Sequence, residues 1–242
     1  MTLFNEKKYI EEIVKTNNKE MASNLRLGQL VYLLTLYYYE TEKDETLLYS
    51  MVIDKLNELD IKCNNLNKIV LNIIKIVTSN TKILKDQDEV VLYQSEADCI
   101  NQLKSQTERK ILATLFVLAR WNDNDGWTNV GFTISDIKKY ADISSYTKAQ
   151  MNNCLYQLVS QGMIVLSKNP KFLRYQVKLT TNTNENVACT FKQFEHIGNS
   201  FIAQTVDGYD LCRTCGNLIH KAPRKPRLYC RWCIKKRKHM ND

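Results

Sequence analysis

The sequence is poor in the residues that build most enzyme signatures. It has only seven glycines and three histidines among 242 residues. It contains no glycine-rich phosphate-binding loop, no His-Glu-x-x-His motif and no Gly-x-Ser-x-Gly motif. Acidic residues are plentiful, but no spaced set of them indicates a metal-dependent nuclease. The sequence therefore predicts a protein that is not an enzyme and has no catalytic residues, unless carboxylates that are distant in the sequence meet in the fold.

Long hydrophobic runs are also missing. The two most apolar stretches, LVYLLTLYYY and IVLNIIKIV, are shorter or more interrupted than the roughly 20 apolar residues that span a bilayer. The first residues, MTLFNEKKYIEEIVK, lack the apolar segment of a secretory signal peptide. We therefore expect a cytoplasmic protein with no membrane partner.

Positive charge is concentrated near the C-terminus. The chain has a net charge of +8, from 34 basic and 26 acidic residues. Residues 211–242 contain ten of the basic residues and one acidic residue, Asp242, so residues 1–210 are close to neutral. Such an uneven distribution of charge is typical of a basic tail that binds a polyanion.

The eight cysteines form two groups. Four are scattered singly, at Cys63, Cys99, Cys154 and Cys189, and are expected to be buried, unreactive thiols. The other four form two Cys-x-x-Cys pairs near the C-terminus. In a reducing compartment such pairs indicate a metal site rather than disulfides.

The fold is predicted to be mainly α with small β elements, and residues 1–94 to form a helical domain. Three segments of this region carry apolar residues at helical spacing, and Asp44 is placed to cap the second helix. These rows of apolar residues, the apolar stripes, are expected to pack together as the core of the domain. The alternative is that they form a surface for homodimerisation. Residues 89–93 (EVVLY) are predicted to be a short strand, and Ser95 with Asp98 to cap the helix that follows.

Residues 95–180 are predicted to form three helices followed by a two-stranded hairpin. An amphipathic helix, SQTERKILATLFVLARW, precedes a polar loop. A short helix in FTISDIKKYADIS is opened by a capping pair, Thr133 and Asp136, and a second helix in SYTKAQMNNCLYQLVSQGMI ends at Gly162. The segment MIVLSKNPKFLRYQVKL alternates like two strands around a tip. The pattern TISDIKKYADIS…LYQLVSQGMI resembles the core signature of the winged-helix family.

The resemblance implies DNA binding by the helix in SYTKAQMNNCLYQLVSQGMI. Gln and Asn can pair with adenine in the major groove, Lys can reach phosphate or guanine, and the wing adds contacts to the DNA backbone. This helix has one basic residue and would bind duplex weakly by itself, and winged helices also serve as protein-binding modules. The residues assigned to the interface are Tyr146, Thr147, Lys148, Gln150 and Asn153 on the helix, and Lys168, Lys171 and Arg174 on the wing.

A bridge is predicted after this module. The polar stretch TTNTNEN is interpreted as a linker or a hairpin turn. In residues 181–210 a strand, a short helix capped by Thr190 and another strand are expected. The bridge is interpreted as structural.

Residues 211–242 are predicted to form a zinc module. Two Cys-x-x-Cys pairs separated by 14 residues suit one structural Zn²⁺, and four protein thiolates leave no open coordination position for catalysis. Gly216 suits a tight turn after the first pair, and the second pair opens a basic helix whose dipole favours thiolates. This order resembles a treble clef or zinc ribbon, with Trp232 expected in its small core. The predicted ligands are Cys212, Cys215, Cys230 and Cys233.

The basic residues of this module are predicted to contact a nucleic-acid backbone. They are Arg224, Lys225, Arg227, Arg231, Lys235, Lys236, Arg237 and Lys238. With the pattern C-x-x-CG…YC-x-x-C at its end, the chain resembles uncharacterised proteins of phages and mobile elements of low-G·C Gram-positive bacteria. That resemblance implies no assigned activity.

The leading functional hypothesis is a non-enzymatic regulator that binds nucleic acid, with DNA favoured over RNA. In it the basic module supplies electrostatic affinity and the winged helix supplies register. One alternative is an adaptor or inhibitor that docks on a host protein partner, such as a polymerase or a defence complex. A cryptic metal-dependent nuclease is the other.

Overall fold

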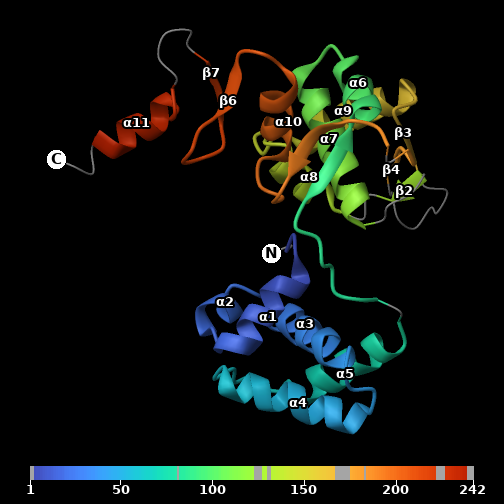
Figure 1. Ribbon diagram of the computed structural model, residues 1–242, viewed down its shortest axis with the longest axis vertical. Helices are drawn as coiled ribbons and strands as arrows, with labels where there is room; N and C mark the ends of the chain where they lie inside the picture. Colours follow the sequence, from blue (N-terminus) through green and yellow to red (C-terminus); the bar gives the residue numbers. More distant parts are fainter. Residues whose placement is uncertain are drawn as a thin grey trace. The chain divides into compact units, whose positions relative to one another are not determined.

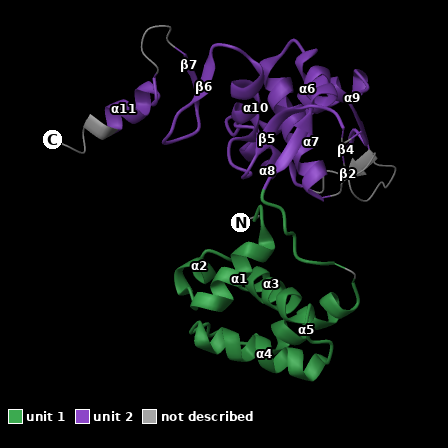
Figure 2. Ribbon diagram, in the orientation of Figure 1, with its two compact units in different colours: residues 1–88 green, residues 89–242 purple. Residues whose placement is uncertain are grey.

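The computed structural model describes residues 3–80, 82–122, 127–129, 132–166, 175–182, 184–221 and 227–238. The chain divides into two compact units, Met1–Asp88 and Glu89–Asp242 (Figure 2). Both are mainly helical, and the second also carries small antiparallel sheets and a cluster of cysteines (Figure 1). The predicted class of a mainly α protein with small β elements is thus confirmed.

The regular elements described in the first unit are all helices. Asp44 caps α4 by accepting hydrogen bonds from the backbone N–H groups of Thr46 and Leu47, as its place in the sequence predicted. The core lies where α3 packs against α4 and α5, and it contains most of the predicted apolar stripes, although Leu47, predicted to face inward, is 54% exposed. The helices are α1 (Glu6–Thr16), α2 (Lys19–Ser23), α3 (Leu27–Tyr39), α4 (Glu45–Glu58) and α5 (Leu66–Thr78).

The second unit is organised around one buried helix, α7. Every residue from Ile111 to Trp121 in this helix is buried. The helix is contacted by α6, α8, α9 and α10, and an aromatic cluster of Trp121, Phe132, Tyr140 and Phe194 packs near its C-terminal end. The helices of the unit are α6 (Gln94–Asn101), α7 (Gln106–Asn122), α8 (Ile134–Tyr140), α9 (Lys148–Ser160), α10 (Ile197–Thr205) and α11 (Arg231–Lys238).

Three small antiparallel sheets complete the second unit among the described residues. The predicted strand at 89–93 is present as β1, and it pairs with a strand nearly 100 residues later, with Val90 opposite Phe191. A second sheet has the strand order β2-β4-β3, and a third joins β6 to β7. The strands are β1 (Val90–Tyr93), β2 (Trp127–Asn129), β3 (Ile164–Leu166), β4 (Tyr175–Lys178), β5 (Val187–Phe191), β6 (Tyr209–Leu211) and β7 (Leu218–His220).

Two of the predicted helix caps are wrong. The helix α6 begins at Gln94 rather than after Ser95, and the side chain of Glu96 accepts the backbone N–H of Tyr93, which stands at the N-cap. Thr190 does not cap α10, because it lies inside β5. The N-cap of α10 is His196, which adopts a left-handed backbone conformation with φ of 61° and makes no side-chain cap.

The cap predicted at the start of α8 and the end predicted for α9 are confirmed. Thr133 accepts the N–H of Asp136, and Asp136 accepts the N–H of Thr133, at the start of α8. The helix α9 ends at Ser160, and Gly162 follows with φ of 71°, a backbone conformation that glycine adopts at little cost.

Candidate metal centre and basic helix

The first cysteine pair lies in a tight turn at the end of a hairpin. The hairpin is β6 paired with β7, in which Tyr209 lies opposite His220. Within the turn, the N–H of Gly216 donates to the carbonyl oxygen of Cys212 at 2.9 Å, and the N–H of Cys212 donates to the carbonyl oxygen of Asn217 at 2.8 Å. Gly216 has φ of +62°, so the turn requires the backbone freedom of glycine, as predicted.

The second cysteine pair opens helix α11. Cys230 directly precedes the helix, and its carbonyl oxygen accepts the N–H of Ile234 at 3.1 Å. The preceding chain is tied to the first pair, because the N–H of Arg213 donates to the carbonyl oxygen of Leu228 at 3.0 Å. These local structures bring both pairs to one point.

The four cysteine sulfurs form one cluster that could hold a metal ion. All four Sγ atoms lie within 4.8 Å of one another, and those of Cys215 and Cys230 are 3.7 Å apart. Tetrahedral Zn²⁺ with Zn–S bonds of about 2.3 Å places its sulfurs about 3.8 Å apart. The N–H of Cys230 also points to the Sγ of Cys212 at 3.3 Å, a contact that favours a thiolate. Donor set and spacing both fit a tetrahedral metal ion.

The thiols of the cluster differ in their tendency to ionise. Burial acts to raise the pKa of Cys212, but backbone N–H groups of Cys230, Thr214 and Cys215 lower it to about 6. Burial and the neighbouring sulfurs raise the pKa of Cys233 to about 12. A cluster of four thiolates therefore requires a cation among them, because the sulfurs otherwise oppose one another's ionisation.

The cysteine cluster supplies most of the core of its own module. Of the residues described in it, the buried ones are Cys212, Cys233 and a single aliphatic side chain, Ile219, with Tyr229 packed at the edge. So small an apolar core contributes little stability. The module is therefore expected to depend on the metal and on contacts with the rest of the second unit.

A polar network docks this module on helix α10. The side chain of Asn199, which is 3% exposed, donates from Nδ2 to the carbonyl oxygen of Gly216 at 3.1 Å. Its Oδ1 accepts from Lys110 Nζ at 2.6 Å, and its backbone N–H donates to Asp142 Oδ2 at 3.0 Å. The other carboxylate oxygen of Asp142 lies 2.6 Å from Nδ1 of His196. One network thus joins α7, the turn after α8, α10 and the first cysteine turn.

Substitution of Gly216 by alanine is expected to weaken this docking. The new methyl group would overlap the imidazole ring of His196, whose position is fixed by Asp142. Overpacking of this kind costs about 1–3 kcal/mol. Gly208→Ala is the matched control, since Gly208 has φ of +86° but no atom within 4 Å of the added methyl. Hydrogen exchange of β6 and β7 should rise more in Gly216→Ala than in Gly208→Ala, and equal exchange would contradict the docking role.

The residues predicted to read DNA lie in the first half of α9 or just before it, but three of them have other partners. Thr147 accepts the N–H of Gln150, and Gln150 Oε1 accepts the N–H of Thr147 at 2.8 Å, so both side chains cap the helix. Tyr146 is half-buried, and its hydroxyl lies 3.1 Å from the hydroxyl of Thr107 on α7. Lys148 and Asn153 are exposed. Sequence reasoning missed Tyr156, which is 63% exposed on the same helix.

The predicted basic contacts are placed only in part. Arg227, Arg231, Lys235 and Lys236 are exposed. Arg237 and Lys238 belong to α11, but their side chains are outside the described part of the structure. The remaining predicted contacts lie outside the described residues: Lys168, Lys171, Arg174, Arg224 and Lys225.

The prediction that Trp232 packs in the core of the module is wrong. Its side chain is 64% exposed, and Nζ of Lys236 lies 5.4 Å from the centre of its ring. Cys233 faces the cluster, and successive residues of a helix are rotated by about 100°, so Trp232 turns away from the sulfurs. The basic helix therefore presents an aromatic face as well as cations.

Comparison with known proteins yields no relative. A scan against protein-family models, a search of curated proteins and a search of solved structures each found no match. Within the described part of the chain, no helix is both long and apolar enough to cross a bilayer.

Proposed function

We propose that this chain is a non-enzymatic nucleic-acid-binding protein whose C-terminal module is a zinc-bound treble clef or zinc ribbon. The observation that carries the proposal is the cysteine cluster at the base of α11, a helix whose described cations are all exposed. Arg231, Lys235 and Lys236 lie on this helix, and Arg227 lies just before it. A basic surface on a metal-bound fold attracts a polyanion. Because such a fold is already ordered, little conformational entropy of the chain is lost on binding.

Zinc is proposed as the metal because of the donor set. Four cysteines prefer a soft, tetrahedral ion, and the sulfur separation agrees with Zn–S bonds. Four protein ligands close the coordination sphere, so the ion would have a structural role. Bound there, it would hold the hairpin β6–β7 against the start of α11.

The middle of the second unit is proposed to be a winged helix. The order α7, β2, α8, α9, β3, β4, with a β2-β4-β3 sheet, supports this assignment. In that fold α9 would face the major groove. Lys148, Asn153 and Tyr156 are the exposed residues that suit this role, whereas Thr147 and Gln150 are used largely as caps. This module would supply register on DNA rather than most of the affinity.

The affinity of the chain for nucleic acid is expected to fall steeply with salt and to depend on α11. Each neutralised phosphate contributes about −0.9 to the slope of log K against log salt on duplex DNA. The double variant Lys235→Glu/Lys236→Glu should therefore flatten the slope by about 2 and lower affinity about 10- to 100-fold at low salt, equally on unrelated sequences. Fluorescence anisotropy over a salt series measures both quantities.

The control is a pair of exposed lysines on α5, changed to Lys68→Glu/Lys75→Glu. It alters the net charge by the same amount in the first unit. If both double variants lost the same affinity, the effect would belong to net charge and not to α11. Binding that does not depend on salt would contradict the proposed function altogether.

A further inference from the structure

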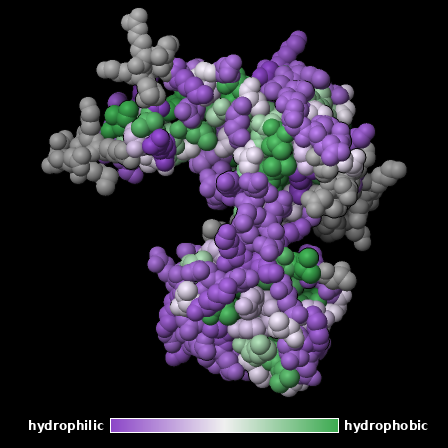
Figure 3. Space-filling model, viewed as in Figure 1, coloured by the Kyte–Doolittle hydropathy of each residue, from purple (hydrophilic) through white to green (hydrophobic). Residues whose placement is uncertain are grey.

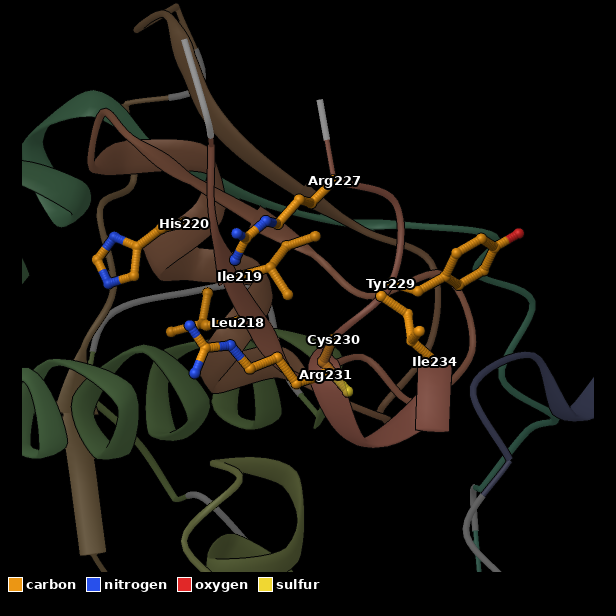
Figure 4. Close-up of a pocket in the computed structure, with 8 residues that line it drawn as sticks. All are labelled: Leu218, Ile219, His220, Arg227, Tyr229, Cys230, Arg231 and Ile234. Atoms are coloured by element: carbon orange, nitrogen blue, oxygen red, sulfur yellow. The ribbon is translucent and has the colours of Figure 1, made fainter. Parts of the chain in front are cut away.

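A pocket lies between strand β7 and helix α11, beside the cysteine cluster. Its volume is about 430 Å³, within the range of about 300–1,000 Å³ that small-ligand sites occupy. Figure 4 shows the side chains that line it. Figure 3 shows hydrophobic surface among polar atoms over the part of the molecule that Figure 1 labels β7 and α11.

Two guanidinium groups give the pocket a positive side. Arg227 and Arg231 both line it, and in Figure 4 their guanidinium groups extend on the side of Leu218 and His220. Asp and Glu are absent from the lining residues that the structure describes. A single guanidinium group can bind phosphate through two parallel hydrogen bonds, so a side with two of these groups suits a phosphate.

The other lining residues are mostly apolar. Leu218, Ile219 and Ile234 are aliphatic, and the ring of Tyr229 lies with Ile234 at the end away from His220 (Figure 4). His220 is itself held against Tyr209, with ring centres 4.6 Å apart. A flat, weakly polar group such as a nucleobase can pack against these side chains. A phosphate ion alone would make no apolar contact with them.

Trp232 provides a second place for a base on the same helix. Its indole is 64% exposed, and Nζ of Lys236 lies over the ring, 5.4 Å from its centre, where it would face the phosphate of a nucleotide stacked there. Stacking of a base on an exposed aromatic ring does not depend on sequence. Because Trp232 follows Arg231 directly in α11, two neighbouring nucleotides of one strand could reach both places.

From these features we infer that the pocket between β7 and α11 binds one nucleotide of a single-stranded nucleic acid, with its base against Ile219 and Ile234 and its phosphate on Arg227 and Arg231. The inference rests on the proposed function and makes it more specific. A base in a duplex is paired and stacked and cannot enter such a pocket without flipping out. The module therefore selects unpaired strands.

The test uses two residues of nearly equal exposure. Ile234 is 41% exposed and lines the pocket, whereas Leu228 is 39% exposed and does not. The full-length, zinc-loaded chain is titrated with fluorescent 20-nucleotide single-stranded DNA, RNA of the same sequence, and the matching duplex. Single strands should bind about tenfold more tightly than duplex. Ile234→Ser should lose about tenfold on single strands and little on duplex, and Leu228→Ser should lose little on either.

A second pair of variants keeps the test valid if Ile234→Ser does not fold. Arg227→Gln removes a lining cation, and Arg213→Gln removes an exposed cation of the same module that does not line the pocket. Arg227→Gln should reduce the preference for single strands more than Arg213→Gln. Zinc content and circular dichroism verify the fold of each variant, and the DNA and RNA arms show which strand is preferred.

The outcomes separate this inference from the proposed function. Salt-dependent binding with no preference for single strands, or equal losses in the two members of each pair, would overturn the nucleotide pocket and leave the proposed function standing. Absence of binding to all three probes would overturn both. A preference for single strands that is lost only in the pocket variants supports both.

Discussion

Removal of the proposed metal is expected to unfold β6, β7 and α11 while the first unit stays folded. Among its described residues the module has one buried aliphatic side chain, that of Ile219, besides its cysteines, so this apolar core cannot hold it together. Binding of structural zinc to small modules is worth about 10–16 kcal/mol and is coupled to their folding. A strong chelator or the variant Cys212→Ser should therefore abolish protection of β6, β7 and α11 from hydrogen exchange.

Thiol alkylation followed by mass spectrometry gives an independent reading of the same event. The prediction that Cys63 is buried is wrong, because it is the exposed cysteine among the eight. In the metal-loaded chain Cys63 should therefore react first. After chelation the four cluster cysteines should react as well. Cys189 should stay unmodified in both states, because burial raises the pKa of its thiol to about 12 and leaves almost no thiolate at neutral pH.

The control for Cys212→Ser is Cys154→Ser, a half-buried thiol on α9 outside the cluster. It should keep one zinc per chain and the protection of β6 and β7. Loss of metal should also weaken nucleic-acid binding, because the cations of α11 would then lie on a flexible segment. A chain that keeps its C-terminal protection without metal would show that docking on Asn199 is sufficient to fold the module.

The local structure was largely predictable from the sequence because its determinants are close together along the chain. The cysteine spacing, the glycine after the first pair, the cap at Asp44 and the pair Thr133 and Asp136 each involve residues a few positions apart. The capping role of Gln150 also had a visible signal. Thr147-x-x-Gln150 is the sequence of a capping box, but it was assigned to base reading.

The docking of the cysteine module could not be predicted in the same way. Asn199 meets Lys110, 89 residues earlier, and Gly216, 17 residues later, and no periodic pattern links these positions. The exposure of Trp232 was missed for a related reason. An aromatic residue next to a ligand suggests a core, but the module is too small to enclose a second large side chain beside Tyr229.

The variant Arg120→Met is expected to be the most destabilising side-chain change in the second unit away from the metal. Arg120 is 6% exposed on α7 and forms an ion pair with Glu96, which is 3% exposed on α6. Its guanidinium also lies 4.9 Å from the ring of Tyr93. Removing one partner of a buried pair leaves the other charge uncompensated and costs about 3–5 kcal/mol.

Tryptophan fluorescence during denaturation measures this change selectively, because all three tryptophans of the chain lie in the second unit, at 121, 127 and 232. The double variant Glu96→Gln/Arg120→Met should recover part of the loss, since it leaves no buried carboxylate. Glu96 also accepts the N–H groups of Tyr93 and Thr180, so the pair ties α6 to the chain after β4. A double variant no more stable than Arg120→Met would mean that these backbone contacts, and not the charge of Arg120, account for the stability of Glu96 in its buried position.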